Sequence, residues 1–136
     1  MSVDAEVASV LSKLFQTLDH EDAEGFADCW SEDVQFQMQT FDGAINKASG
    51  RTAIVAMCES FWTGKPSMLR HAVGAVWVEP IGVDRVCARF YCQYFNVGAT
   101  PSLAGMGEYR DELVRCEDGR WRVAVREHVF LTPLAH

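Results

Sequence analysis

His71 is the side chain whose type and setting most strongly indicate chemistry in this sequence. It opens a largely apolar stretch, SMLRHAVGAVWV at residues 67–78, in which an ionisable ring is unexpected. Side chains alternate between the faces of a strand, so His71 should share a face with Val73 and Trp77, while Arg70 faces the other way. A histidine in that position is a core residue satisfied by a backbone carbonyl, a residue at the rim of the surface, or a general base facing a cavity.

A carboxylate partner for His71 can be sought in the segment TLDHEDAEGF. Asp19 follows Leu18, the last member of an apolar helical stripe, so a helix that continues to Asp19 would bring its carboxylate near the buried face. Glu21 and Asp22 are equally available, and any of the three could instead be a turn or capping residue. An Asp–His pair would hold the imidazole through Nδ1–H and leave Nε2 to take a proton from carbon or oxygen.

Arg126 is a third candidate, in the last strand of the sequence. Alternation puts it with His128 and Phe130 on one face and Glu127 on the other. A buried arginine in a sheet can hold an oxyanion or a leaving group. It can also simply pair with an acid of the preceding strand, where the choices are Glu108, Asp111 and Glu112.

Other polar residues show less sequence evidence for a catalytic role. The phenols that could donate a hydrogen bond are Tyr91, Tyr94 and Tyr109, each of which also fits an ordinary strand aromatic. The remaining histidines show no evident partner in the sequence: His20, His128 and His136.

Helices are expected in the first half of the chain and strands in the second. The spacing of apolar residues predicts a helix over 5–18, a short helix capped by Asp22 that carries Phe26 and Trp30, and a third helix opening after Gly50 and reaching Phe61. Alternation predicts strands over 34–41, 69–79, 85–97, 107–116 and 120–131, the last two joined by a hairpin at 117–119. This order predicts an α+β fold in which three N-terminal helices pack on a curved, mostly antiparallel sheet.

Length and composition fit one soluble domain spanning residues 1–136. The chain has 49% hydrophobic and 23% charged residues and a formal net charge of −7, without a basic run. That balance argues against nucleic acid and membranes as partners. The first ten residues lack the basic start and apolar core of a signal peptide, so we expect a cytoplasmic protein. A small-molecule substrate would bind where the expected curved sheet opens around the helices.

Metal and cofactor motifs are not found in the sequence. The five cysteines are an odd number without metal-ligand spacing, and the glycines around Met106 lack the strand-before, helix-after setting of a dinucleotide site. We therefore expect no metal and no cofactor.

Four segments in order resemble the SnoaL-like branch of the nuclear transport factor 2-like superfamily, whose fold is a cystatin-like cone. They are TLDHEDAEGFADCWSEDVQF, SGRTAI, RHAVGAVWVE and GEYRDELVRCEDGRWRVAVRE. Within that superfamily the sequence is most similar to the group of scytalone dehydratase and hexachlorocyclohexane dehydrochlorinase. The resemblance implies an Asp19–His71 base dyad, a pocket arginine at Arg126, and a homodimer or homotrimer.

The resemblance also has departures that affect the expected reaction. The dehydrochlorinase has a pocket lysine about one turn before its aspartate, where this chain has Leu14 and Phe15, so dechlorination is not expected. The sequence predicts a cofactor-independent dehydratase-type lyase or isomerase acting on a small, apolar, cyclic substrate. Its pocket would be lined by Phe15, Trp30, Phe61, Trp77, Phe90 and Tyr109. The alternatives are a non-catalytic ligand-binding or assembly module and a polyketide-type cyclase.

Overall fold

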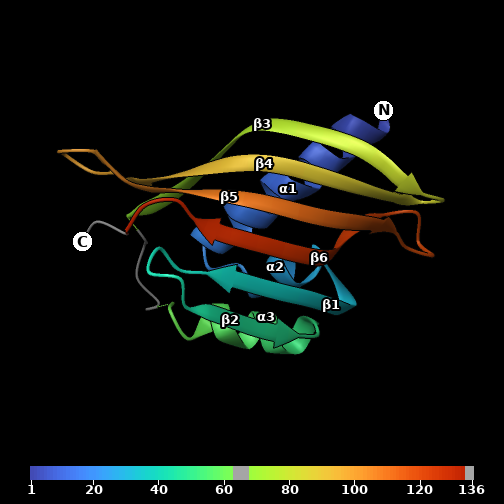
Figure 1. Cartoon of the computed structure of the whole chain (residues 1–136), viewed down its shortest axis with the longest axis horizontal. Helices are drawn as coiled ribbons and strands as arrows, with labels where there is room; N and C mark the ends of the chain where they lie inside the picture. Colours follow the sequence, from blue (N-terminus) through green and yellow to red (C-terminus); the bar gives the residue numbers. More distant parts are fainter. Residues whose placement is uncertain (63–67, 134–136) are drawn as a thin grey trace.

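The computed structural model describes residues 1–62 and 68–133 of the chain. Its helices are α1 (Val3–Asp19), α2 (Ala23–Ala27) and α3 (Arg51–Glu59). Its strands are β1 (Trp30–Gln39), β2 (Ile45–Ser49), β3 (Leu69–Gly82), β4 (Arg85–Asn96), β5 (Ser102–Arg115) and β6 (Trp121–Phe130). Figure 1 shows them as one sheet with the helices behind it. None of the helices in the described residues is long and apolar enough to cross a membrane.

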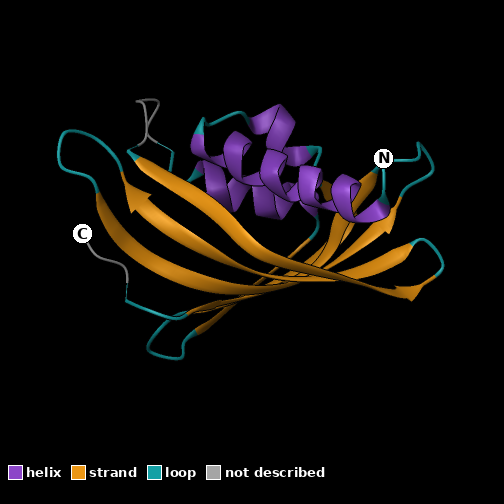
Figure 2. Cartoon of the chain, turned by 90° about the horizontal axis from the view of Figure 1, so that it is seen from above, coloured by secondary structure: helices purple, strands orange, loops and turns teal. Residues whose placement is uncertain are grey.

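The six strands form one sheet in the order β2-β1-β6-β5-β4-β3. Neighbouring strands are antiparallel except β1 and β6, which are parallel. The sheet curves strongly, and all three helices lie in its concave side (Figure 2). The predicted α+β architecture, three helices on a curved and mostly antiparallel sheet, is confirmed.

Helix α1 forms where the apolar repeat predicted it. Ser2 caps its first turn by accepting a hydrogen bond from the backbone N–H of Ala5. The apolar stripe is buried against the sheet, including Val7, Leu11 and Leu14. The stripe thus fixes which face of the helix turns inward, and with it the position of the residues at the end of the helix.

Several predicted boundaries were wrong. Trp30 was expected on the second helix but begins β1, and Phe61 lies two residues beyond the end of α3. Strand β2 was not predicted, since its residues Ile45–Ser49 are mostly exposed and lack an apolar face. Strand β5 begins at Ser102, inside the segment expected to be a loop.

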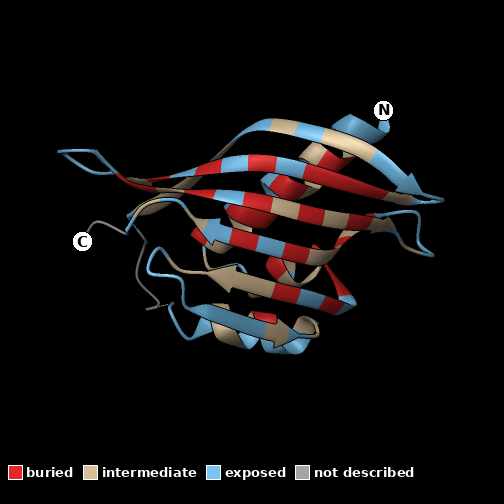
Figure 3. Cartoon of the chain, viewed as in Figure 1, coloured by how far each residue is buried: buried red, intermediate tan, exposed pale blue. Residues whose placement is uncertain are grey.

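Buried and exposed side chains alternate along the central strands, which gives the sheet a core face under the helices and an outer face (Figure 3). Register shifts interrupt this alternation at several points, and two of them bear on the predicted site residues. One lies in β3 between Gly74 and Trp77, where Ala75 has φ 54°. The other lies opposite Glu112 and Leu113, where the register of β6 skips a residue. Each extra residue reverses the faces of the side chains that follow it.

Candidate active site

Asp19 and His71 lie in direct contact at the inner face of the sheet. The Nδ1 atom of His71 is 2.5 Å from Oδ1 of Asp19, and the backbone N–H of His71 donates to Oδ2 at 2.9 Å. Both oxygens of one carboxylate are therefore engaged by one residue, which fixes the imidazole relative to the strand. With Nδ1–H donated to Asp19, the Nε2 lone pair is left to act as a base.

The fold brings this pair together from two distant segments. Asp19 is the last residue of α1, directly after the buried stripe, and its side chain is 4% exposed. His71 is the third residue of β3, the edge strand that α1 packs against, and its side chain is 13% exposed. Burial strengthens the contact because water cannot compete for the carboxylate.

Two aromatic rings confine the imidazole of His71. Phe15, one turn before Asp19 on α1, stacks on it with ring centroids 5.3 Å apart and an interplanar angle of 23°. Tyr94 on β4 meets it edge to face at 5.2 Å. The ring therefore has a fixed orientation, which a general base requires if its nitrogen is to meet a substrate proton in line.

Arg126 faces the interior and forms a two-point ion pair with Asp111 on the adjoining strand. Its Nε and Nη2 atoms donate to the two carboxylate oxygens at 2.9 and 2.7 Å. The side chains are 4% and 0% exposed, respectively. Of the acids that the sequence offered, the structure selects Asp111, which stands directly opposite Arg126 in the β5–β6 register. The charge of Arg126 is thereby balanced inside the protein, and its role toward a substrate stays a prediction.

Four of the predicted pocket residues gather around the Arg126 guanidinium. Its central carbon lies 4.9 to 5.9 Å from the ring centroids of Phe15, Trp30, Phe90 and Tyr109. All four aromatic side chains are buried. They form the aromatic interior of the concave side, at cation–π distance from a positive charge.

Two predicted pocket residues were placed wrongly. Trp77 is 58% exposed and lies on the outer face, because the bulge at Ala75 reverses the alternation between His71 and Trp77. Phe61 is 76% exposed, because α3 ends at Glu59 before the helical repeat reaches it. Neither side chain shares the interior with His71.

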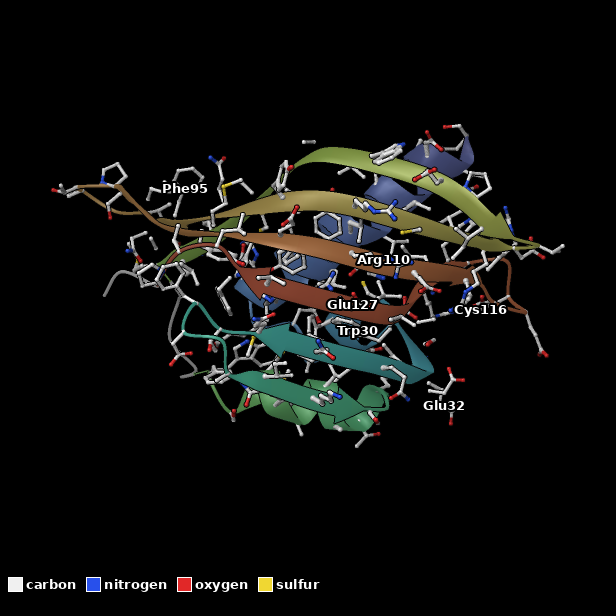
Figure 4. All side chains as sticks on the ribbon, in the orientation of Figure 1. Trp30, Glu32, Phe95, Arg110, Cys116 and Glu127 are labelled. Carbon is white, nitrogen blue, oxygen red and sulfur yellow. The ribbon has the colours of Figure 1, made fainter. Side chains whose placement is uncertain are left out.

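The exposed Trp77 belongs to a hollow on the outer face with a volume of about 400 Å³, also lined by Tyr91 and Val129. Its walls also include four charged residues, and the guanidinium of one of them, Arg89, lies 5.3 Å from the Trp77 ring. Arg110 and Glu127, on neighbouring strands of this face, approach to 4.0 Å (Figure 4). The whole thickness of the sheet separates this hollow from the Asp19–His71 pair.

A second polar cluster lies on the inner face beside His71. The Tyr94 hydroxyl is 2.9 Å from the Tyr109 hydroxyl and 2.7 Å from Nε2 of His128. The His128 ring stacks on Tyr109 with centroids 3.9 Å apart. The sequence offered His128 no partner, and the structure supplies one from a strand that is not its neighbour. The pairing register of the three strands is the signal that could have revealed this cluster, because it places Tyr109 of β5 directly opposite His128 of β6.

The pKa of His128 is lowered to about 3. Burial is the main cause, because it penalises the charged imidazolium, and the electrostatic contributions of Arg126 and His71 act in the same direction. His128 is therefore neutral at physiological pH and presents one N–H donor and one acceptor nitrogen.

This lowered pKa predicts a loss of stability in mild acid. Below its ordinary pKa of 6.5 the imidazole binds a proton in the unfolded chain, whereas in the folded chain it does so only near pH 3. The contribution of neutral His128 to the free energy of unfolding is thus fully present above pH 6.5. It decreases as the pH falls, by about 2 kcal/mol at pH 5. Urea unfolding at pH 7.5 and pH 5 should show this extra loss in the wild type and not in His128→Gln. Equal losses in both proteins would contradict it.

Metal ligation has no obvious place among these residues. Over residues 1–62 and 68–133, no group of three or more His, Cys, Asp and Glu side chains could hold a metal ion. What the interior offers is a base with its orienting carboxylate, a phenol–imidazole cluster and aromatic walls. This combination fits proton abstraction and hydrogen bonding to a small, largely apolar molecule.

The comparisons with known proteins agree with this geometry at the level of the domain. The family model described as "SnoaL-like domain" matches residues 1–127. Among curated proteins, none matches the chain.

Solved structures match over most of the chain. ActVI-ORFA from Streptomyces coelicolor has a TM-score of 0.79 at 25% identity, covering 93% of this chain and 95% of that one. A protein from Catenulispora acidiphila in complex with S-DNPA has a TM-score of 0.77 at 28% identity, covering 93% and 91%. Aln2 from a Streptomyces species, at 22% identity and a TM-score of 0.75, covers 91% and 87% and shows the shared fold.

Proposed function

Since the chain belongs to the family of SnoaL-like domains, which includes polyketide cyclases and related enzymes, we propose that it is a cofactor-independent enzyme of proton abstraction. His71 removes a proton from the carbon next to a carbonyl group of a small cyclic substrate, and Asp19 holds and charge-balances the imidazole. The observation that carries this proposal is the 2.5 Å contact between Nδ1 of His71 and Oδ1 of Asp19, with Nε2 left over.

The outcome of proton abstraction depends on what the substrate carries. With a hydroxyl on the neighbouring carbon, the C–H electron pair forms the new double bond and the hydroxyl leaves as water, taking the proton that His71 holds. This is dehydration. With a second carbonyl in reach, the same enolate closes a ring in an aldol step, a polyketide-type cyclisation that family membership favours. Both reactions use the same base.

The substrate class follows from the interior. Phe15, Phe90 and Tyr109 are buried and pack against one another, and Phe15 also stacks on His71, so the surroundings of the base are aromatic. The indole N–H of Trp30 is buried and finds no hydrogen-bond partner among the described residues. A buried donor of this kind costs about 1–3 kcal/mol unless something accepts its hydrogen bond. A substrate oxygen would supply that acceptor, so an apolar ring system with few oxygens fits best.

The test is turnover of 3-hydroxy-1-tetralone, a bicyclic β-hydroxy ketone whose dehydration gives the aromatic product 1-naphthol. The purified wild type should raise the rate of 1-naphthol formation, followed by fluorescence, above that of an equal concentration of free imidazole. Plain 1-tetralone in D₂O isolates the first step, because abstraction and return of an α-proton replaces hydrogen with deuterium. Proton NMR follows this exchange.

The alternative function, a ligand-binding module, gives a different pattern in the same assays. If the wild type binds 1-tetralone in a titration yet catalyses neither naphthol formation nor deuterium exchange, proton abstraction is wrong for this substrate class and binding is favoured. Deuterium exchange without naphthol formation would support His71 as the base and favour isomerisation or cyclisation over dehydration.

A further inference from the structure

Tyr94 is the centre of a buried hydrogen-bond cluster made by three adjacent strands. Its hydroxyl contacts the Tyr109 hydroxyl of β5 at 2.9 Å and the His128 Nε2 atom of β6 at 2.7 Å. The three side chains are 2%, 3% and 7% exposed, so water contributes little to these bonds. Such a cluster is costly to bury unless each of its groups has a partner.

Gly107 provides the space in which these groups meet. A Cβ atom at this position would lie 2.0 Å from the Tyr94 hydroxyl oxygen and 2.6 Å from His128 Nε2. The backbone of Gly107 does not have a positive φ, so the glycine is required here by space rather than by conformation. Any side chain at position 107 would force Tyr94 and His128 apart.

In the tautomer that carries the proton on Nε2 of His128, the cluster has one more hydrogen-bond donor than it uses internally. The hydroxyl oxygen of Tyr94 can accept two hydrogen bonds, one from the Tyr109 O–H and one from His128 when Nε2 carries its proton. In that arrangement both lone pairs of Tyr94 are used within the protein. Its own O–H is then free to donate to a group outside the cluster.

The dyad is adjacent to this free donor. The Tyr94 ring meets the His71 ring edge to face with centroids 5.2 Å apart, so a base and a hydrogen-bond donor border the same part of the interior. Arg126, by contrast, has two of its nitrogens committed to Asp111. Tyr94 is therefore better placed than Arg126 to meet charge that develops on a substrate oxygen.

We propose that Tyr94 is the catalytic hydrogen-bond donor to the substrate carbonyl oxygen, and that Tyr109 and His128 are positioning residues that orient its O–H. This inference rests on the proposed function, whose base it complements. When His71 Nε2 takes the α-proton, the C–H electron pair forms the carbon–carbon double bond of an enolate and the carbonyl oxygen gains the negative charge. Tyr94 stabilises that oxygen by a hydrogen bond and keeps its proton.

The electrostatics of the cluster agree with a donor that does not ionise. Burial raises the pKa of Tyr94 well above its ordinary value, which keeps the phenol protonated throughout the physiological range. Burial likewise keeps His128 neutral, so the cluster holds no charge of its own that would repel an enolate.

The first experiment compares Tyr94→Phe with Tyr91→Phe in the deuterium-exchange assay on 1-tetralone. Tyr94→Phe should lower kcat by about 10²–10³-fold, the usual effect of removing one donor to an oxyanion, while KM changes little. Tyr91 lies on the same strand but on the outer face and is 43% exposed, so its variant should match the wild type. Equal kcat in Tyr94→Phe and the wild type would overturn the inference.

A binding measurement tests the donor without turnover. The carbon-13 NMR shift of 1-tetralone labelled at its carbonyl carbon should move downfield on binding to the wild type and to His71→Gln, because a hydrogen bond polarises the carbonyl. It should stay near its value in an apolar solvent in Tyr94→Phe. A downfield shift that persists in Tyr94→Phe would also overturn the inference. The carbonyl shift can follow this pattern although neither the wild type nor any variant exchanges deuterium. In that case the proposed function is wrong, but Tyr94 is still the hydrogen-bond donor to the bound carbonyl.

Variants of His128 and Gly107 test whether His128 orients the hydroxyl of Tyr94. Glutamine can donate to Tyr94 from its amide, so His128→Gln should retain most of kcat, whereas His128→Leu should lose about tenfold or more with KM little changed. Gly107→Ala keeps every polar group but displaces Tyr94 and His128, so it should reproduce the loss of the carbonyl shift. If His128→Gln and His128→Leu lower kcat equally while Gly107→Ala leaves the shift intact, the assignment of positioning residues is wrong.

Discussion

Replacing His71 with glutamine should lower kcat/KM for dehydration of 3-hydroxy-1-tetralone by about 10²–10⁴-fold, the usual contribution of a general base. Glutamine is of similar size and can still bond to Asp19, but its amide cannot take a proton near neutral pH. The ring stacking with Phe15 is lost as well, yet this affects orientation and not the chemistry of proton transfer. Fluorescence of the 1-naphthol formed measures the rate.

Asp19→Asn should give a loss of similar order by a different route. An asparagine amide can donate to Nδ1 of His71, which favours the tautomer with the proton on Nε2. The nitrogen that faces the substrate would then be a donor and no longer a base. The double variant should be little worse than either single one, because the two residues act as a unit.

A matched control is available at the end of the same helix. His20 follows Asp19 directly and is exposed, and its Nδ1 atom bonds to the backbone carbonyl of Gln16. His20→Gln should keep the wild-type rate, which shows that changing a histidine near the dyad is harmless in itself. Near-wild-type rates in both His71→Gln and Asp19→Asn, with folding intact by circular dichroism, would refute the dyad mechanism.

Asp111→Ala should lower the free energy of unfolding by about 3–5 kcal/mol, the usual cost of leaving one member of a buried ion pair uncompensated. The pair is almost completely buried, so the charge of Arg126 would have neither water nor a carboxylate to stabilise it. Urea unfolding at pH 7 measures the change. The effect should be on stability first, because Asp111 is not in contact with His71 through any described hydrogen bond.

Glu112 offers a neighbouring comparison on the outer face of the same strand. It pairs with Arg85 and Arg110, but these partners are 37% and 36% exposed. Glu112→Gln should therefore cost less than about 1 kcal/mol. Replacing both Asp111 and Arg126 with leucine should recover much of the lost stability. A cost below about 1 kcal/mol for Asp111→Ala would contradict the account of this pair.

Much of the architecture could be predicted from the sequence because its signals are local. The apolar repeat around Leu11 and Leu14 depends only on the 3.6-residue turn of a helix, and the Asp118-Gly119 turn closes its hairpin by backbone preference alone. The order of such elements then predicted three helices on a curved sheet. The family resemblance added Asp19 and His71, which the residues alone left among several choices.

Side-chain facing could be predicted only as far as the strands stayed regular. His71 was correctly expected to face inward, but Trp77 was not correctly placed, since the bulge at Ala75 moves the residues that directly follow it to the other face. Gly74 borders that bulge, and a glycine inside a strand is a signal for one, but the positive φ of 54° falls on Ala75, which is not glycine. The position of the bulge depends on how β3 must bend to follow β4, which is a property of the whole sheet.

What the sequence determined by itself was the set of elements and the chemical groups they carry, because helical periods, strand alternation and turns are read within a few residues. Tertiary structure alone decided which groups meet. Asp19 contacts His71 across 52 positions of sequence, Arg126 selects Asp111 among three acids, and Tyr94 reaches His128 beyond its neighbouring strand. Each of these contacts requires strand order and register, which arise only when the curved sheet closes around α1 and its apolar face is buried.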